Sequence, residues 1–140
     1  MKTALTHIEK TTERLFELLD RLATESTKGT TIIVEGQNDV DTLRKLEVKG
    51  DIIQAKTSGK SFLDVIGEIE EQGKREVIIL MDFDRRGIEW TKRLTQNFER
   101  MKIKSNLLFW NELRNLVGRE VKDVEGLASY VETLKERCKI

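Results

Sequence analysis

The sequence predicts an α/β fold in which a four-stranded parallel sheet is flanked by helices on both faces. Short apolar, β-branched segments alternate four times with longer segments of helical periodicity between residues 29 and 109. This alternation with short connections is typical of parallel sheets with helical crossovers. The apolar segments are also continuous rather than alternating, as expected for strands that are buried on both faces.

The strands are expected where β-branched and aliphatic residues cluster, at residues 30–34, 51–55, 76–81 and 103–109. The first segment, Thr30-Thr31-Ile32-Ile33-Val34, ends at Glu35-Gly36. The third segment is the strongest, because it runs without a polar residue from Val77 to Met81. Each strand is followed by a segment whose apolar residues have helical spacing.

The helices are expected at residues 4–24, 38–47, 62–73, 87–101, 110–118 and 123–138. The first repeats leucine and isoleucine at helical spacing, and Gly29 is suited to end it. Asn38 or Asp39 is a suitable cap for the second. We therefore expect one compact domain, in which an N-terminal amphipathic helix (1–28) and a C-terminal helical extension (110–140) flank a core (29–109).

The composition excludes several classes of protein. The 140 residues include 25 basic and 25 acidic side chains, so the formal net charge is zero. This balance disfavours coating of nucleic acid by bulk charge. Cys138 is the only cysteine, which excludes an internal disulfide and a cysteine zinc cluster. Without a signal peptide or an apolar segment of membrane-spanning length, a cytoplasmic location and no membrane partner are expected.

Acidic side chains follow two of the expected strands. Glu35 comes directly after the first, with Asp39 four residues further on, and Asp82 and Asp84 follow the third. Because parallel sheets bind ligands outside the carboxyl ends of their strands, we expect these carboxylates at one edge, with Asp82 and Asp84 pointing the same way. Clustered carboxylates repel unless a cation lies among them, and such oxygen ligands favour Mg²⁺ or Mn²⁺. For Asp84, an N-cap is the alternative interpretation.

These residues carry a resemblance to a known family. The chain has Glu35-Gly36 at the end of the first strand, and Asp82-Phe83-Asp84 followed by Gly87 at the end of the third. In this order and at this separation, the two motifs resemble the Toprim domain, which bacterial-type primases, topoisomerases and OLD-family nucleases share. The resemblance covers about residues 30 to 109 and is to a small stand-alone Toprim protein.

The resemblance implies a Rossmann-like sheet and a site built on acids. It implies that Glu35 is a general acid or base, which also takes part in metal binding in some relatives. It further implies that Asp82 and Asp84 hold Mg²⁺. Asp39 lies where Toprim proteins often carry an additional acid, and its alternative is a helix-start residue favoured by the helix dipole.

Candidate phosphate-binding residues lie close to these acids in the sequence. Ser58 and Lys60 are in the loop after the second strand, and Arg85 and Arg86 follow the acidic pair. Their side chains suit phosphates beside a metal, while turn chemistry explains the loop and solvation explains the arginines as alternatives. The tryptophans, Trp90 and Trp110, are spaced for helix packing, with base stacking as the less favoured interpretation.

The sequence therefore predicts Mg²⁺-dependent phosphodiester chemistry on RNA or DNA, with a nuclease as the first choice. The alternative is a non-catalytic Toprim module that binds nucleic acid or a partner protein, with the terminal helices as docking surfaces. Topoisomerase activity is disfavoured because the only tyrosine, Tyr130, lies in a helical pattern that indicates packing. With zero net charge, nucleic-acid binding is expected to be weak without the metal.

Overall fold

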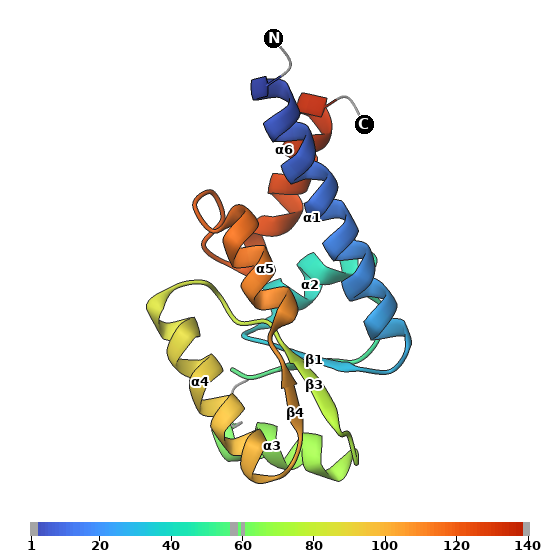
Figure 1. Cartoon of the computed structure of the whole chain (residues 1–140). Coiled ribbons are helices and arrows are strands. Elements are labelled where there is room, and N and C mark those ends of the chain that lie inside the picture. Colours follow the sequence, from blue (N-terminus) through green and yellow to red (C-terminus); the bar gives the residue numbers. More distant parts are fainter. Residues whose placement is uncertain (1–2, 57–58, 60, 139–140) are drawn as a thin grey trace.

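The strands form the four-stranded parallel sheet that the sequence predicts (Figure 1). The computed structural model describes residues 3–56, 59 and 61–138. Its strands are β1 (Thr31–Val34), β2 (Ile52–Gln54), β3 (Glu76–Ile79) and β4 (Lys104–Asn106). They lie in the order β2-β1-β3-β4, and all three neighbouring pairs are parallel. The two central strands are therefore β1 and β3, which carry the acidic motifs at their ends.

Helices cover both faces of this sheet (Figure 1). They are α1 (Thr3–Thr27), α2 (Gln37–Lys45), α3 (Phe62–Glu71), α4 (Arg85–Arg100), α5 (Leu108–Val117) and α6 (Leu127–Cys138), with a 3₁₀ turn, η1 (Val124–Gly126). One face packs against α3 and α4, and the opposite face packs against α1, α2 and α5. The helix α6 lies beyond α2 and adds to the same apolar core. No helix in the described part of the chain is long and apolar enough to cross a membrane.

The central strands are buried on both sides, which explains their continuous apolar sequences. Ile32 and Val34 of β1 belong to the core on the α1 face, while Ile33 between them belongs to the core on the α3 face. In the same way, Ile78 and Ile79 of β3 point to opposite cores. This period of two fixes the register of the sheet, because a slip of one residue would exchange the two faces.

The N-terminal and C-terminal helices share one core. Leu15 and Leu22 of α1 are fully buried in the same cluster as Leu113 of α5. Trp110 of α5 is also buried, and its indole N–H donates a hydrogen bond of 3.0 Å to the carbonyl oxygen of Met81. The helix pair therefore holds the chain directly before Asp82, at the carboxyl end of the sheet.

The fourth strand is shorter than the sequence predicts. Residues 103–109 are expected in a strand, but β4 spans only Lys104–Asn106, and α5 begins at Leu108. The side chain of Asn106 ends the strand, because its Oδ1 accepts a hydrogen bond of 3.0 Å from the Leu108 N–H. Residue 109, the expected end of the core, lies inside α5.

Candidate active site at the carboxyl end of the sheet

A hollow of about 300 Å³ lies at the carboxyl ends of β1 and β3. We call it the carboxylate hollow. Its lining residues are Glu35, Gly36, Gln37, Asn38, Asp39, Lys56, Asp82 and Glu125. Three of the four acids that the sequence singled out are thus together, at the edge where parallel sheets bind ligands.

Glu35 is held at the end of β1 with its side chain turned inward. Its backbone carbonyl accepts a hydrogen bond of 2.8 Å from the Lys56 N–H, which continues the ladder beyond β2. Its side chain is only 15% exposed, and Oε2 lies 3.6 Å from the Nζ of Lys56. The other oxygen, Oε1, is buried and receives no hydrogen bond from the described residues. A buried carboxylate oxygen without a donor is costly, so this atom needs a proton or a cation.

The environment of Glu35 raises its pKa to about 7. Burial is the largest cause, followed by the neighbouring carboxyl group of Asp82, and the charge of Asp84 adds to the effect. Lys56 acts in the opposite direction but does not cancel the rise. Protonated Glu35 is a hydrogen-bond donor toward Asp82, whereas two ionised carboxylates only repel. A carboxyl group that titrates near neutrality is suited to general acid or base catalysis.

Asp82 is positioned by a segment far along the chain. Its Oδ1 accepts a hydrogen bond of 3.1 Å from the Val124 N–H. The next residue, Phe83, donates its backbone N–H to the carbonyl of Lys122 at 2.9 Å. The segment between α5 and α6 therefore fixes the acid after β3, and its Glu125 completes the lining of the carboxylate hollow.

Asp39 has the helix-start role that the sequence left open, and it also lines the carboxylate hollow. Its Oδ2 accepts a hydrogen bond of 3.0 Å from the Gly36 N–H, so the side chain closes the start of α2. It is buried, and burial raises its pKa despite this hydrogen bond. The carboxyl groups of Asp82, Asp123 and Glu125 raise the pKa further. Asp39 is thus a structural residue that also adds to the acidity of the hollow.

Asp84 is placed differently from the other three acids. It is exposed and caps α4, because its Oδ1 accepts a hydrogen bond of 2.7 Å from the Gly87 N–H. The alternation expected for Asp82 and Asp84 does not continue past β3, since Leu80 and Phe83 lie in the same core cluster. Asp84 therefore stands beside the carboxylate hollow without lining it, although its charge affects Glu35.

The expected phosphate-binding residues are only partly placed. Arg85 and Arg86 are exposed in the first turn of α4, and Arg85 pairs with Glu89 at 3.7 Å. Ser58 and Lys60 lie outside the described residues. The two arginines are the first two residues after Asp84 in the chain, so they remain candidates for contacts with substrate phosphates.

The glycines of the two motifs differ in their physical role. A Cβ atom at Gly87 would collide with the backbone of Asp82, so the close approach of α4 to the end of β3 requires glycine. A Cβ atom at Gly36 would meet nothing within 4 Å. Gly36 therefore satisfies no packing requirement, and the missing side chain leaves room in the carboxylate hollow.

Lys56 is a residue of the hollow that the sequence did not indicate. It comes two residues after β2, which pairs with β1, so it emerges beside Glu35. A search of all strand ends for charged residues would have found it. Glu125 belongs to an acidic stretch, residues 122–126, that is loosely similar to a segment of some Toprim relatives, with a helix start capped by Asp123 as the alternative interpretation. The structure shows this cap, and Glu125 reaches the hollow, 43 positions after Asp82, only through tertiary structure.

The pair of Glu35 and Asp82 fits an open Mg²⁺ or Mn²⁺ site. Among the described residues, no three His, Cys, Asp or Glu side chains converge into a set that could enclose a metal. Mg²⁺, however, usually takes one or two carboxylates and keeps several waters. The buried Oε1 of Glu35, which lacks a donor, is an atom that a cation would satisfy.

The comparison with protein families agrees with the fold and the motifs. The model of the Toprim domain matches residues 30–117. This range includes β1 to β4 and the four candidate acids, Glu35, Asp39, Asp82 and Asp84. The chain belongs to the Toprim family. Toprim domains typically bind Mg²⁺, and the family has a metal-dependent role in nucleic-acid metabolism. The resemblance that the two acidic motifs indicated is confirmed.

Relatives of this Toprim chain match most of its length. A UPF0292 protein from Methanosarcina acetivorans is 38% identical over 128 residues, which cover 91% of this chain and 87% of the relative. A UPF0292 protein from Methanocaldococcus jannaschii is 38% identical over 120 residues, with 85% of this chain and 91% of the relative covered. A solved structure of a protein from Aquifex aeolicus matches with a TM-score of 0.65 and 26% identity, over 78% of this chain and 94% of that one.

Proposed function

We propose that this Toprim protein is a Mg²⁺-dependent nuclease whose reaction takes place in the carboxylate hollow. The observation that carries the proposal is the pair of Glu35 and Asp82, in which a mostly buried glutamate has a pKa of about 7 beside a second acid. Perturbed carboxyl groups in a cleft are a mark of functional sites. Hydrolysis of a phosphodiester needs a proton acceptor for water, a proton donor for the leaving oxygen, and compensation of negative charge.

In this proposal Glu35 is the general acid or base. As a carboxylate it accepts a proton from the attacking water, and in its protonated form it donates one to the oxygen that leaves phosphorus. In the metal-free chain a pKa of about 7 keeps both forms populated at neutral pH, and a bound cation would favour the carboxylate. Lys56, 3.6 Å from the Glu35 carboxylate, holds that side chain in place and adds positive charge next to the substrate phosphate.

The metal would be held by Asp82 and Glu35, and Asp84, whose charge reaches Glu35, is a further candidate ligand. When bound, Mg²⁺ supplies compensation for the negative charge that develops on the phosphoryl oxygens. Asp82 is suited to this role because the Val124 N–H occupies one side of its carboxylate and fixes its orientation. Arg85 and Arg86 of the neighbouring helix start would contact flanking phosphates.

A cleavage assay with end-labelled RNA and DNA, in Mg²⁺ or Mn²⁺, tests the proposal. Removal of one general acid or base typically lowers the rate by roughly 10²–10⁴-fold, so Glu35→Gln is expected to lose at least about 100-fold. Asp82→Asn removes a metal ligand and is expected to abolish the metal-dependent cleavage. Glu13→Gln and Asp20→Asn make the same chemical changes at exposed positions of α1 and serve as matched controls. Cleavage that survives both substitutions in the hollow would overturn the proposal.

The non-enzymatic module is the competing outcome of the same assay. If the wild-type protein cleaves neither RNA nor DNA in either metal but still binds them, the hollow is a metal-assisted binding site and not a nuclease centre. Binding measured by fluorescence anisotropy with and without Mg²⁺ separates these outcomes.

A further inference from the structure

A row of cationic and aromatic side chains continues outward from the carboxylate hollow. We call Lys56, Trp90, Phe62 and Arg93 the aromatic strip. Lys56 joins it to the hollow, because its Nζ lies 3.6 Å from Glu35 Oε2 and 5.7 Å from the centre of the Trp90 ring. Phe62 meets Trp90 in an edge-to-face contact, with ring centres 5.5 Å apart. The guanidinium carbon of Arg93 then lies 4.3 Å from the centre of the Phe62 ring.

The strip follows one face of α4, away from the acids. Arg86, Trp90 and Arg93 are spaced by four and three residues, which places them on the same side of the helix. Arg86 lies in the first turn, two residues after the capping Asp84, and Arg93 lies about 10 Å further along the helix axis at 1.5 Å per residue. Cations therefore stand on both sides of Trp90 along the helix.

The two rings of the strip are open enough to accept a ligand. Trp90 and Phe62 are half-buried, with one side packed against the core between the sheet and the α3–α4 layer. The planar guanidinium of the exposed Arg93 lies over Phe62, and a flat base would stack there by displacing this exposed side chain. Leu63, next to Phe62 in α3, is 72% exposed and extends the apolar surface.

We propose that the aromatic strip is a stacking site that seats an unpaired base of single-stranded nucleic acid beside the carboxylate hollow. Aromatic rings stack on any base, and interleaved cations contact the phosphates between bases. In a duplex the faces of the bases are already covered by their neighbours, so a stacking site selects single strands. The inference rests on the proposed function, to which it adds a substrate class and a direction for the strand, from Glu35 along α4.

Binding of a fluorescent single-stranded oligonucleotide and of the matching duplex to the Asp82→Asn protein, in which cleavage is blocked, tests the strip. Trp90→Leu added to this protein is expected to weaken single-strand binding about tenfold, the effect of losing one stacked base. Duplex binding should change by less than about twofold, because duplex bases do not reach the rings. An equal loss for both ligands, or no loss for either, would overturn the inference.

Trp90→Phe keeps an aromatic ring at this position and is the control for misfolding as the cause of weaker single-strand binding. We expect it to retain single-strand binding within about threefold, while the quenching of tryptophan fluorescence by the bound oligonucleotide disappears because Trp110 is buried. Quenching that persists in Trp90→Phe would contradict stacking on Trp90. Arg93→Gln should weaken single-strand binding about twofold, and Lys92→Gln, an exposed cation on another face of α4, should not.

The two proposals fail in different ways. If Glu35→Gln and Asp82→Asn abolish cleavage but Trp90→Leu leaves single-strand binding and cleavage unchanged, the stacking site is wrong and the nuclease stands. If Trp90→Leu weakens single-strand binding selectively while cleavage survives both acid substitutions, the stacking site stands and the catalytic assignment is wrong.

Discussion

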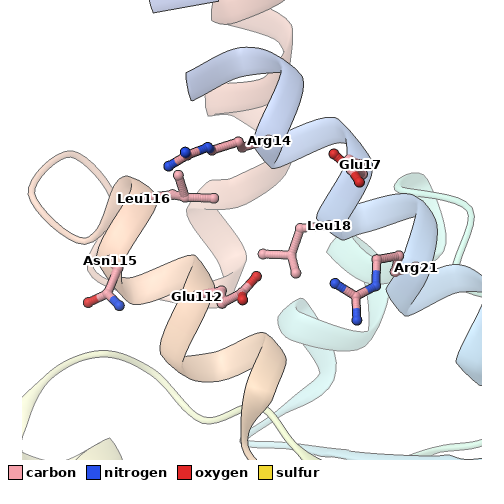
Figure 2. Close-up of a pocket in the computed structure, with 7 residues that line it drawn as sticks. All are labelled: Arg14, Glu17, Leu18, Arg21, Glu112, Asn115 and Leu116. Carbon is pink, nitrogen blue, oxygen red and sulfur yellow. The ribbon is translucent and has the colours of Figure 1, made fainter. Parts of the chain in front are cut away.

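Two hollows of similar size lie on this molecule, and they differ in how charge is arranged. The carboxylate hollow encloses about 300 Å³, and a second one between α1 and α5, which we call the helix hollow, encloses about 360 Å³. Figure 2 shows that its charged side chains come from both helices, with Arg14, Glu17 and Arg21 on α1 and Glu112 on α5. Positive and negative groups thus alternate in the helix hollow.

In the carboxylate hollow, four acids are opposed by a single lysine. Burial, together with the neighbouring carboxyl groups, raises the pKa of Glu35 to about 7. The two hollows therefore differ in the arrangement of charge rather than in volume. Buried, uncompensated carboxyl groups mark the carboxylate hollow as the candidate site, because they include a group that can exchange protons at neutral pH.

The largest expected difference between the two hollows is in catalysis. Glu35→Gln should lower the rate of metal-dependent cleavage by at least about 100-fold, because the proton carrier is lost. Glu112→Gln makes the same chemical change in the helix hollow and should leave the rate within about twofold. The rates are compared under single-turnover conditions, and a loss of equal size in both variants would show that charge imbalance does not mark the site.

The second difference concerns the two motif glycines. Gly87→Ala forces a Cβ atom against the Asp82 backbone and is expected to cost about 1–3 kcal/mol in the free energy of unfolding, and to lower activity. Gly36→Ala has room for the added atom and should leave stability unchanged while it lowers activity by partly filling the carboxylate hollow. Urea denaturation measures the first effect. A stable, active Gly87→Ala protein would contradict the packing argument.

Metal binding should stabilise the folded chain through the carboxylate hollow alone. At a Mg²⁺ concentration of about ten times its Kd, binding to the folded state adds about 1.4 kcal/mol. We expect Mg²⁺ to raise the Tm of the wild-type protein and of Glu112→Gln at pH 8, and to have no such effect on Asp82→Asn. Differential scanning fluorimetry with Mg²⁺ and with Na⁺ at matched ionic strength makes the comparison.

The smallest effect is the pH dependence of stability in the metal-free protein. The pKa of Glu35 is raised from 4.5 to about 7, so the folded chain binds this proton more tightly than the unfolded chain does. The stability from this proton is complete below pH 4.5 and is lost as the pH rises through about 7. Glu35→Gln removes the loss, so the variant should be more stable than wild type at pH 8 but not at pH 4.

The full change in the free energy of unfolding that corresponds to this pKa shift is not expected, because the Glu35 side chain is partly open to solvent. We expect a gain of about 1 kcal/mol for Glu35→Gln at pH 8, with EDTA present to exclude bound metal. Glu13→Gln, an exposed position on α1, controls for the general effect of removing one negative charge. A gain that is the same at both pH values would show that ionisation of Glu35 is not its cause.

The sequence predicted the fold best where a short continuous run of residues indicates both the type of element and its burial. Residues 32–34 and 77–79 are continuous apolar segments that are buried on both faces, so the strands that contain them were predicted and are confirmed. The predicted end of β4, at Phe109, was wrong, because apolar residues such as Leu108 and Phe109 occur in buried strands and buried helices alike. In the structure, the Leu108 N–H donates a hydrogen bond to Asn106 Oδ1 at the point where the strand ends and the helix begins.

For the site, the rule that parallel sheets bind ligands at the carboxyl ends of their strands predicted three of the four acids in the carboxylate hollow. These three are Glu35, Asp39 and Asp82. It could not predict that Asp84 would turn to cap α4, since the same residue type serves both purposes. It also did not place Glu125 in the hollow, because that position depends on how the segment after α5 returns to the sheet. Long-range contacts of this kind follow from packing and have no local pattern.

The segment between α5 and α6 determines when, during synthesis of the chain, the contacts of the candidate site are complete. The backbone partners of Phe83 and Asp82 are Lys122 and Val124, which the ribosome adds about forty residues after the acids themselves. The strands can pair while synthesis is still in progress, but the carboxylate after β3 gains its clamp only once residue 124 has emerged. A chain that is still being translated and has not yet reached residue 124 therefore carries all of its acidic motifs without the contacts that hold Asp82 and Phe83.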